Sequence, residues 1–120
     1  MRRRSGPNQD RFVGPGQKLI LRSPDGLVVF AWRKAQYRLD GQTGVECVLF
    51  RNESSRLSSA LILEAVALAA GRWPGERLFT YCTATVDRAG RLIRYGRCFL
   101  EAGWRLIDAR GWRFLWELTP

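Results

Sequence analysis

The chain has 120 residues, three cysteines, no histidine and a formal net charge of +9. This length predicts one compact domain. Three distant cysteines without any histidine exclude an ordinary zinc site and a Ser-His-Asp or Cys-His catalytic relay. The excess of arginine favours a polyanionic partner such as nucleic acid, with an evenly charged, solvated surface as the alternative.

The first residues are basic and rich in glycine and proline. No apolar segment follows them, so they are not a secretory signal. We expect residues 1–15 to form a flexible arm before a single domain over residues 16–120. The sequence contains no run of about 18 apolar residues, so we expect no membrane contact. Thiols that pack as small, reduced core residues indicate a cytoplasmic protein.

Three strands are expected before the first helix. Residues 17–22 and 27–33 predict a hairpin around the turn Ser-Pro-Asp-Gly at 23–26. Residues 45–51 predict a third strand. Strict alternation would place Glu46, Val48 and Phe50 on one face of it and Val45, Cys47 and Leu49 on the other.

A helix and further strands follow. Residues 57–72 are nearly all apolar, which predicts a long buried helix that Pro74 and Gly75 end. Residues 77–85 predict a strand, 97–104 a short helix, and 104–110 with 111–118 a closing pair, while 86–96 have no clear assignment. The chain is therefore expected to be α+β with a mixed, mainly antiparallel sheet in the order β-β-β-α-β-α-β-β.

Hydroxyl-rich residues separate the third strand from the long helix. The start of a helix exposes unpaired N–H groups with a positive partial charge, so beside a strand end it forms a natural phosphate cradle. Arg51 and Arg56 would add charge to this cradle, and Ser58 and Ser59 would add donors. The alternative is an ordinary helix cap.

The order of elements resembles the core of the GNAT acyltransferase superfamily over about residues 16–118. The stretch CFLEAGWRLI is similar to the short helix of that superfamily, which ends in glycine and an aromatic residue. The stretch RNESSRLSSALILEA resembles the loop signature of phage and prophage members, including Mom-type proteins that modify adenine in DNA. The resemblance implies an N-acyltransferase that uses acetyl-CoA or another acyl-CoA and modifies nucleic acid.

The resemblance also implies a site. The cofactor would lie in a splay between strands 45–51 and 77–84, with backbone N–H groups polarising its thioester carbonyl. The residues expected to bind it are Leu49, Phe50, Arg51, Arg56, Leu57, Ser58 and Ser59. Tyr81 is a candidate proton donor, Glu46 a candidate general base, and Asn52 and Ser54 candidate ligand or acceptor contacts. Core packing, an exposed strand position and a helix cap are the respective alternatives.

A basic segment is the candidate nucleic-acid contact. Arginines recur at three-residue spacing, at Arg88, Arg91, Arg94 and Arg97. On a helix they would form a basic ridge that contacts phosphates, whereas in a loop they would be solvated.

Three positions in two parts of the chain differ from the superfamily pattern. Ser59 and Leu61 stand where its phosphate loop has glycine or alanine, and Phe99 stands where its proton-donating tyrosine lies. Its usual first strand and first two helices are also largely absent, which leaves an open acceptor surface or one completed by a second subunit in a homodimer. Two alternative functions therefore stay open: an N-acetyltransferase of a protein or small amine, and a non-catalytic module that binds nucleic acid or a partner protein.

Overall fold

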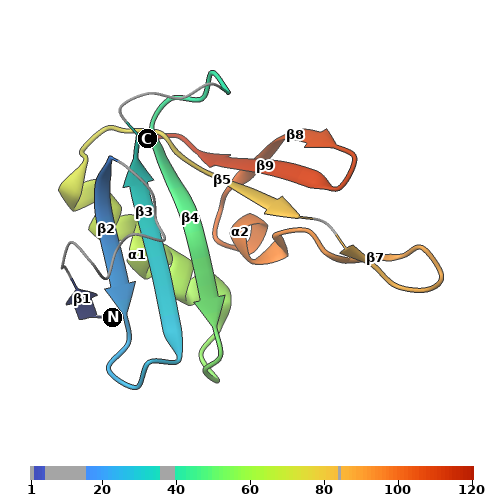
Figure 1. Cartoon of the computed structure of the whole chain (residues 1–120), viewed down its shortest axis with the longest axis horizontal. Coiled ribbons are helices and arrows are strands. Elements are labelled where there is room, and N and C mark those ends of the chain that lie inside the picture. Colours follow the sequence, from blue (N-terminus) through green and yellow to red (C-terminus); the bar gives the residue numbers. More distant parts are fainter. Residues whose placement is uncertain (1, 5–15, 36–39, 84) are drawn as a thin grey trace.

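The computed structural model describes residues 2–4, 16–35, 40–83 and 85–120 of the chain (Figure 1). Its elements are β1 (Arg2–Arg4), β2 (Gln17–Arg22), β3 (Val28–Lys34), β4 (Val45–Asn52), α1 (Ser58–Arg72), β5 (Leu78–Thr83), β6 (Thr85–Val86), β7 (Leu92–Arg94), α2 (Arg97–Glu101), β8 (Arg105–Arg110) and β9 (Arg113–Leu118). The predicted class and the predicted order of six strands and two helices are confirmed. The strand β1 and the β6–β7 pair are additional.

One sheet holds seven of the strands in the order β1-β2-β3-β4-β5-β9-β8. Its neighbouring strands are antiparallel except for β4 and β5, which are parallel. The strand β1 pairs with β2, so residues 2–4 of the segment expected as a loose arm are ordered at the sheet edge. The remaining residues of that segment, 1 and 5–15, lie outside the described residues. A separate two-stranded sheet consists of β6 and β7.

The turn between β2 and β3 explains their register. Ser23 and Asp25 accept three backbone N–H bonds, from Gly26 and Leu27 and from Val28. The Ser23 hydroxyl also donates to Asp25 Oδ1 at 2.6 Å. These short polar side chains replace the strand ladder at the reversal, as the Ser-Pro-Asp-Gly pattern predicts.

The main core lies between the sheet and α1, which crosses one face of β2–β4 (Figure 1). The buried side of α1 carries Leu61, Ile62, Ala65 and Ala69. The Trp32 indole N–H donates to the Ala65 carbonyl at 3.2 Å. The other side of α1 is exposed, including Leu63 and Leu68, so the helix is buried along one side and less completely than the mostly buried helix that was predicted. No helix among the described residues is long and apolar enough to cross a bilayer.

The strand β4 contains a bulge where alternation predicts a regular strand. Neighbouring residues of β3 pair with Cys47 and Leu49, so Val48 is an extra residue in β4. The extra residue reverses the order in which side chains alternate. Phe50 consequently packs with the same helix-side cluster as Cys47, and the predicted placement of these two on opposite faces is wrong.

Candidate functional site

A pocket opens where β4 and β5 stop pairing. The two strands pair only over Val45–Cys47 and Leu78–Thr80. At the last rung the Thr80 hydroxyl donates to the Cys47 carbonyl at 2.8 Å. Beyond it lies a pocket of about 220 Å³, lined by Cys47, Val48, Leu49, Phe50, Thr80, Tyr81, Cys82, Gly96, Cys98 and Phe99. We call it the β4–β5 pocket; it lies where the two strands separate, and Leu49 and Phe50 are the predicted cofactor-binding residues that line it.

The start of α2 forms the far wall of this pocket. A Cβ atom on Gly96 would lie 2.7 Å from the Cys82 sulfur and 2.6 Å from the Trp116 indole nitrogen, so only glycine fits there. The Phe99 ring is buried and meets the Phe50 ring edge-on at 6.3 Å and the Trp104 ring at 4.8 Å. At the position of the superfamily tyrosine, the pocket wall is therefore a packed phenylalanine ring, which has no proton to donate.

The backbone of Phe50 faces the pocket. The Glu53 N–H donates to the Leu27 carbonyl at 2.8 Å, so Glu53 faces the β2–β3 turn beside β4. Backbone groups alternate along a strand, and the strand is regular from Leu49 to Asn52. The N–H of Phe50 therefore points to the opposite edge, where β5 no longer runs alongside. Among the described residues this N–H has no acceptor, so it is a backbone donor of the kind that an oxyanion-binding role requires.

The loop between β4 and α1 is organised by Asn52. Its Nδ2 donates to the Arg56 carbonyl at 2.8 Å and to the Ser58 hydroxyl at 3.0 Å. Its Oδ1 accepts the N–H of Ser54 at 3.0 Å and the Ser54 hydroxyl at 2.6 Å. Asn52 and Ser54 therefore fold the loop, and both remain partly exposed.

The start of α1 has no side-chain cap. Its N-cap is Leu57, which is 66% exposed and extended in backbone conformation, and no side chain bonds to the first-turn N–H groups. The first backbone hydrogen bond of the helix runs from the Leu61 N–H to the Leu57 carbonyl at 3.2 Å. Among the described residues, the N–H groups of Ser58, Ser59 and Ala60 thus have no acceptor. The helix-cap alternative for Asn52, Ser54, Ser58 and Ser59 is not what the structure shows.

The arginines near this helix start are already paired. Arg51 lies 3.5 Å from Glu53, and Arg56 lies 3.1 Å from Glu64. Each arginine side chain is more than half exposed, so these ion pairs are weak and a stronger anion can displace them. The Ser59 side chain is buried, so its hydroxyl is not available at the surface. The cradle therefore consists of backbone N–H groups with two nearby, partly neutralised cations.

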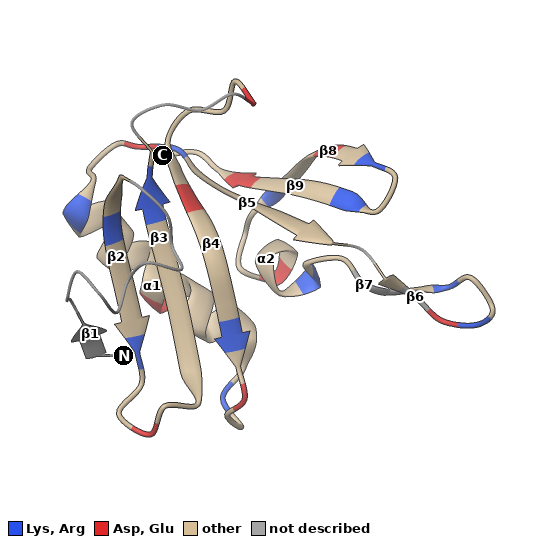
Figure 2. Cartoon of the chain, in the orientation of Figure 1, with Lys and Arg blue, Asp and Glu red and all other residues tan. Residues whose placement is uncertain are grey.

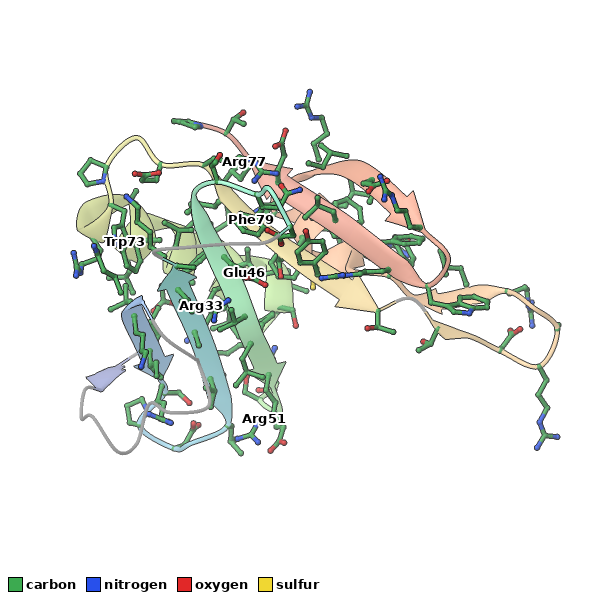
Figure 3. All side chains as sticks on the ribbon, turned by 45° about the horizontal axis from the view of Figure 1, so that its top comes forward. Arg33, Glu46, Arg51, Trp73, Arg77 and Phe79 are labelled. Carbon is green, nitrogen blue, oxygen red and sulfur yellow. The ribbon has the colours of Figure 1, made fainter. Side chains whose placement is uncertain are left out.

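The two candidate catalytic side chains lie on the face of the sheet away from α1. Glu46 forms an ion pair with Arg33 at 3.6 Å and lies beside Phe79 in the neighbouring strand (Figure 3). It does not line the β4–β5 pocket. Tyr81 donates its hydroxyl to Asp40 at 3.1 Å, and the Arg113 guanidinium lies 3.8 Å from its ring centre. Tyr81 is therefore accessible to ligand chemistry, whereas Glu46 takes part in the cross-strand pairing of the sheet.

A second pocket lies on this far face. Its volume is about 290 Å³, and it is lined by Asp40, Gln42, Tyr81, Asp108, Arg110, Arg113 and Leu115. We call it the Tyr81–Arg113 pocket. Tyr81 lines both pockets, so the two adjoin through one residue of β5. Sequence reasoning missed this pocket because its lining comes from the loop before β4 and from the β8–β9 turn, which are far apart in the chain.

Three cysteines that are far apart in sequence converge on the β4–β5 pocket. Cys47, Cys82 and Cys98 are free thiols, as predicted. Burial raises the pKa of the Cys82 thiol to about 11, with a smaller contribution from nearby Cys98. Burial likewise raises the pKa of Cys98 and raises that of Cys47 well beyond its usual range. All three are therefore protonated at neutral pH, which disfavours nucleophilic attack by these thiols. Their convergence has no local sequence signal, because it depends on the splay.

The basic segment is a hairpin and not a helix. Arg88 lies in its turn, Arg91 follows the turn, Arg94 lies in β7 and Arg97 begins α2. Arg91 pairs with Asp87 at 3.0 Å and Arg97 with Glu101 at 3.1 Å. The side chain of Arg94 lies outside the described residues. The helical ridge considered from the spacing is therefore wrong, and Arg88 is instead placed at an exposed tip.

Comparison of the chain with protein-family models, with curated protein sequences and with solved structures finds no significant match. What the protein does must therefore be inferred from the site itself.

Proposed function

We propose that the chain is an acyl-CoA-dependent N-acyltransferase of the GNAT type that modifies nucleic acid in the cytoplasm. The observation that carries this proposal is the β4–β5 pocket, which opens at the only parallel pair of strands among the described residues. It lies alongside residues 47–50 of β4, and the end of that strand at Asn52 leads into the loop before the uncapped start of α1. One extended molecule with an anionic group at one end and an acyl group at the other fits this arrangement.

The donor side of the site uses backbone groups. The first-turn N–H groups of Ser58, Ser59 and Ala60 would hold the pyrophosphate, helped by the positive end of the helix. Bound acyl-CoA would supply an acyl group activated as a thioester. The N–H of Phe50 would orient the thioester carbonyl and stabilise negative charge on its oxygen.

Proton handling falls to side chains around Tyr81 and the thiols. Cys82 and Cys98 line the pocket beside Phe99 and remain protonated, so each holds a proton where the superfamily tyrosine would. On the far side, the Asp40 carboxylate accepts the hydrogen bond of the Tyr81 hydroxyl and lines the adjoining pocket. An acceptor amine in the Tyr81–Arg113 pocket would give up its proton there.

The acceptor is proposed to be nucleic acid because of charge and access. The chain has a net charge of +9, and its arginines include Arg110 and Arg113 at the acceptor-side pocket. Such a surface attracts a polyanion over several ångströms. This attraction weakens as the salt concentration rises.

A second candidate is a non-catalytic module with the same fold. The specific observation in its favour is Phe99, which is buried and packed against two aromatic rings at the expected tyrosine position. In this candidate the pocket would be a remnant, and the basic surface would carry the function.

Thermal unfolding with and without acetyl-CoA or coenzyme A tests the proposal, because a ligand that binds the folded state raises the melting temperature. Ser58→Pro provides a sharp variant. Proline is favourable at the first helical position, and the extended Leu57 before it is compatible with proline. It removes the N–H donor, so we expect about a tenfold loss of affinity for acetyl-CoA.

Ser58→Ala is the matched control, since it removes the same hydroxyl and keeps the N–H. We expect it to bind acetyl-CoA more tightly than Ser58→Pro. No thermal shift with millimolar-range cofactor, or equal binding by both variants, contradicts the proposed donor site. Mass spectrometry of nucleosides from DNA co-expressed with the protein then tests the acceptor, and unmodified DNA despite cofactor binding favours a protein or small amine.

A further inference from the structure

The β6–β7 hairpin projects from the body of the protein. Thr85 pairs with Arg94 and Val86 with Leu92, and no other strand among the described residues pairs with either. Both views of the molecule show it extending beyond the ends of β5 and β9 (Figures 1 and 3). An isolated two-stranded hairpin is at best marginally stable in water. Contacts other than the pairing of its two strands must therefore stabilise the hairpin.

The tip of the hairpin is ordered by its own hydrogen bonds. Asp87 Oδ1 accepts the N–H groups of Ala89 and Arg91, each at 2.9 Å. The Gly90 N–H donates to the Asp87 carbonyl at 3.0 Å, and Gly90 has a φ of 81°. This is a tight turn in which glycine supplies the left-handed residue. It presents Arg88 at the apex in a fixed place.

The base of the hairpin is anchored at the rim of the β4–β5 pocket. The Trp116 indole N–H donates to the Tyr95 carbonyl at 2.8 Å. The Tyr95 ring lies 6.3 Å from that of Phe114, and the next residue, Gly96, fits tightly against Cys82. Cys82 and Gly96, on either side of the hairpin, both line the pocket. Anything held by the hairpin is therefore held beside the pocket.

The hairpin and the neighbouring turn are basic. Residues 85–97 include four arginines and one acidic residue, Asp87 (Figure 2). Among the described residues no acidic side chain forms an ion pair with the exposed Arg88. The β8–β9 turn points to the same end of the molecule and carries Arg110, Arg113 and a 60% exposed Trp112. Arginines interleaved with an exposed aromatic residue are typical of nucleic-acid surfaces.

We propose that the β6–β7 hairpin is an arm that enters the major groove of duplex DNA and holds the duplex beside the β4–β5 pocket. The major groove is about 12 Å wide and about 8.5 Å deep and admits a two-stranded ribbon. The four residue steps from Arg91 to Tyr95 span ~13 Å, which exceeds that depth. Arg88 contacts phosphates from within the groove, and the β8–β9 turn contacts the adjoining backbone. The choice of nucleic acid as partner rests on the proposed function.

Fluorescence anisotropy of a short labelled DNA duplex, measured across a salt series without cofactor, tests the arm. We expect Arg88→Gln to lower the affinity on the order of tenfold and the salt slope by about 1. Arg72→Gln is the charge-matched control, because Arg72 is exposed and ends α1, which lies away from the β6–β7 hairpin (Figure 1). Equal effects of the two variants, or no binding of duplex DNA, overturn the proposal.

Two further measurements separate shape from charge. Gly90→Ala keeps the charge but strains the turn, and its Cβ meets nothing within 4 Å, so the fold should tolerate it. We expect it to weaken DNA binding several-fold, and unchanged binding contradicts insertion of an ordered tip. Duplex RNA has a major groove too narrow to admit the ribbon, so equal affinity for RNA also contradicts it. Because these assays need no acyl-CoA, their failure is distinct from failure of the donor site.

Discussion

The two halves of the sheet differ from the seam that joins them. In the first half, β2, β3 and β4 pair with one another along their lengths, and α1 covers one face of them. In the second half, β5, β9 and β8 also pair along their lengths. Between the halves, β4 and β5 share only three residue pairs. Aromatic contacts compensate on the helix side, where the Trp32 ring stacks on that of Trp104 at 6.2 Å.

This difference explains why the site lies where it does. Each half keeps its own strand pairing, so the seam can open beyond Cys47 and Thr80 and leave only a few backbone groups, such as the Phe50 N–H, unpaired. The pocket, the free Phe50 N–H and the shared Tyr81 all lie at that opening. Changes at the seam should therefore alter both stability and ligand binding, whereas similar changes elsewhere alter stability alone.

The largest effect is expected at the start of the seam. A Cβ atom on Gly44 would lie 2.2 Å from the Arg77 carbonyl oxygen, and Gly44 has a φ of 107°. The same oxygen accepts the Val45 N–H at 2.8 Å, so Gly44→Ala disrupts the first bond between the halves. We expect a loss of about 4 kcal/mol in the free energy of unfolding, measured with urea.

Gly41→Ala is the control for this change. Gly41 also has a positive φ, but a Cβ atom there meets nothing within 4 Å. Strain alone should cost about 1 kcal/mol. If the two variants unfold at the same urea concentration, the close approach of the halves at Gly44 is not what holds the seam.

The second effect concerns the far face of the second half. Glu117 is buried, and its carboxylate accepts bonds from Arg77 at 2.7 Å and Arg105 at 2.6 Å. Glu117→Gln should cost about 2 kcal/mol at neutral pH, since hydrogen bonds to charged groups exceed neutral ones and Arg105 is largely exposed.

The pH dependence of that cost identifies its origin. The bonds from Arg77 and then Arg105 hold the pKa of Glu117 below its usual value of 4.5. The ionised form is thus favoured in the folded state, and its stabilisation is complete above pH 4.5 and lost as the pH falls below it. The difference between wild type and Glu117→Gln should therefore shrink in acid. A difference that is constant with pH would indicate lost packing instead.

The sequence predicts the two halves better than the seam. Hairpin turns such as Ser23–Gly26 and an apolar helix over 57–72 are local signals, so the order of elements follows from them. The bulge at Val48 has no such signal, and it reversed the predicted face of Phe50. The convergence of Cys47, Cys82 and Cys98 also depends on how the halves meet, which neighbouring residues do not encode.

The helix start was predictable in kind but not in detail. The hydroxyl-rich loop indicated a cap or a cradle, and only the geometry of Asn52 distinguishes them, because its side chain bonds within the loop. For the basic segment, the three-residue spacing of arginines left a helix and a loop as alternatives. The segment forms a hairpin because the hydrogen bonds of the Asp87–Gly90 turn close it within five residues.

A smaller effect is expected at the last rung of the seam. Thr80 is buried and its hydroxyl bonds the Cys47 carbonyl. Thr80→Val keeps the shape but leaves that carbonyl unsatisfied, at a cost of about 1.5 kcal/mol in urea unfolding. Because this rung borders the pocket, the thermal shift produced by acetyl-CoA should also fall. Thr80→Ser restores the bond and should recover the shift, and a failure to do so would show that packing of the methyl group matters more.

The smallest effect is a loss of stability at alkaline pH, and it depends on the Cys82 thiol at the seam. Burial raises the pKa of Cys82 from 9.0 to about 11, so the protonated thiol is favoured in the folded state. Stability is full below pH 9.0 and falls as the pH rises toward 11, because the unfolded chain loses this proton first. At pH 10 the loss should be about 1 kcal/mol, reduced by the partial exposure of the thiol. Cys82→Ser and Cys82→Val differ in polarity but neither ionises, so both should flatten the unfolding free energy between pH 9 and 11 relative to wild type. If only one of them does, the slope reflects packing at the rim of the pocket and not the thiol proton that the proposed chemistry uses.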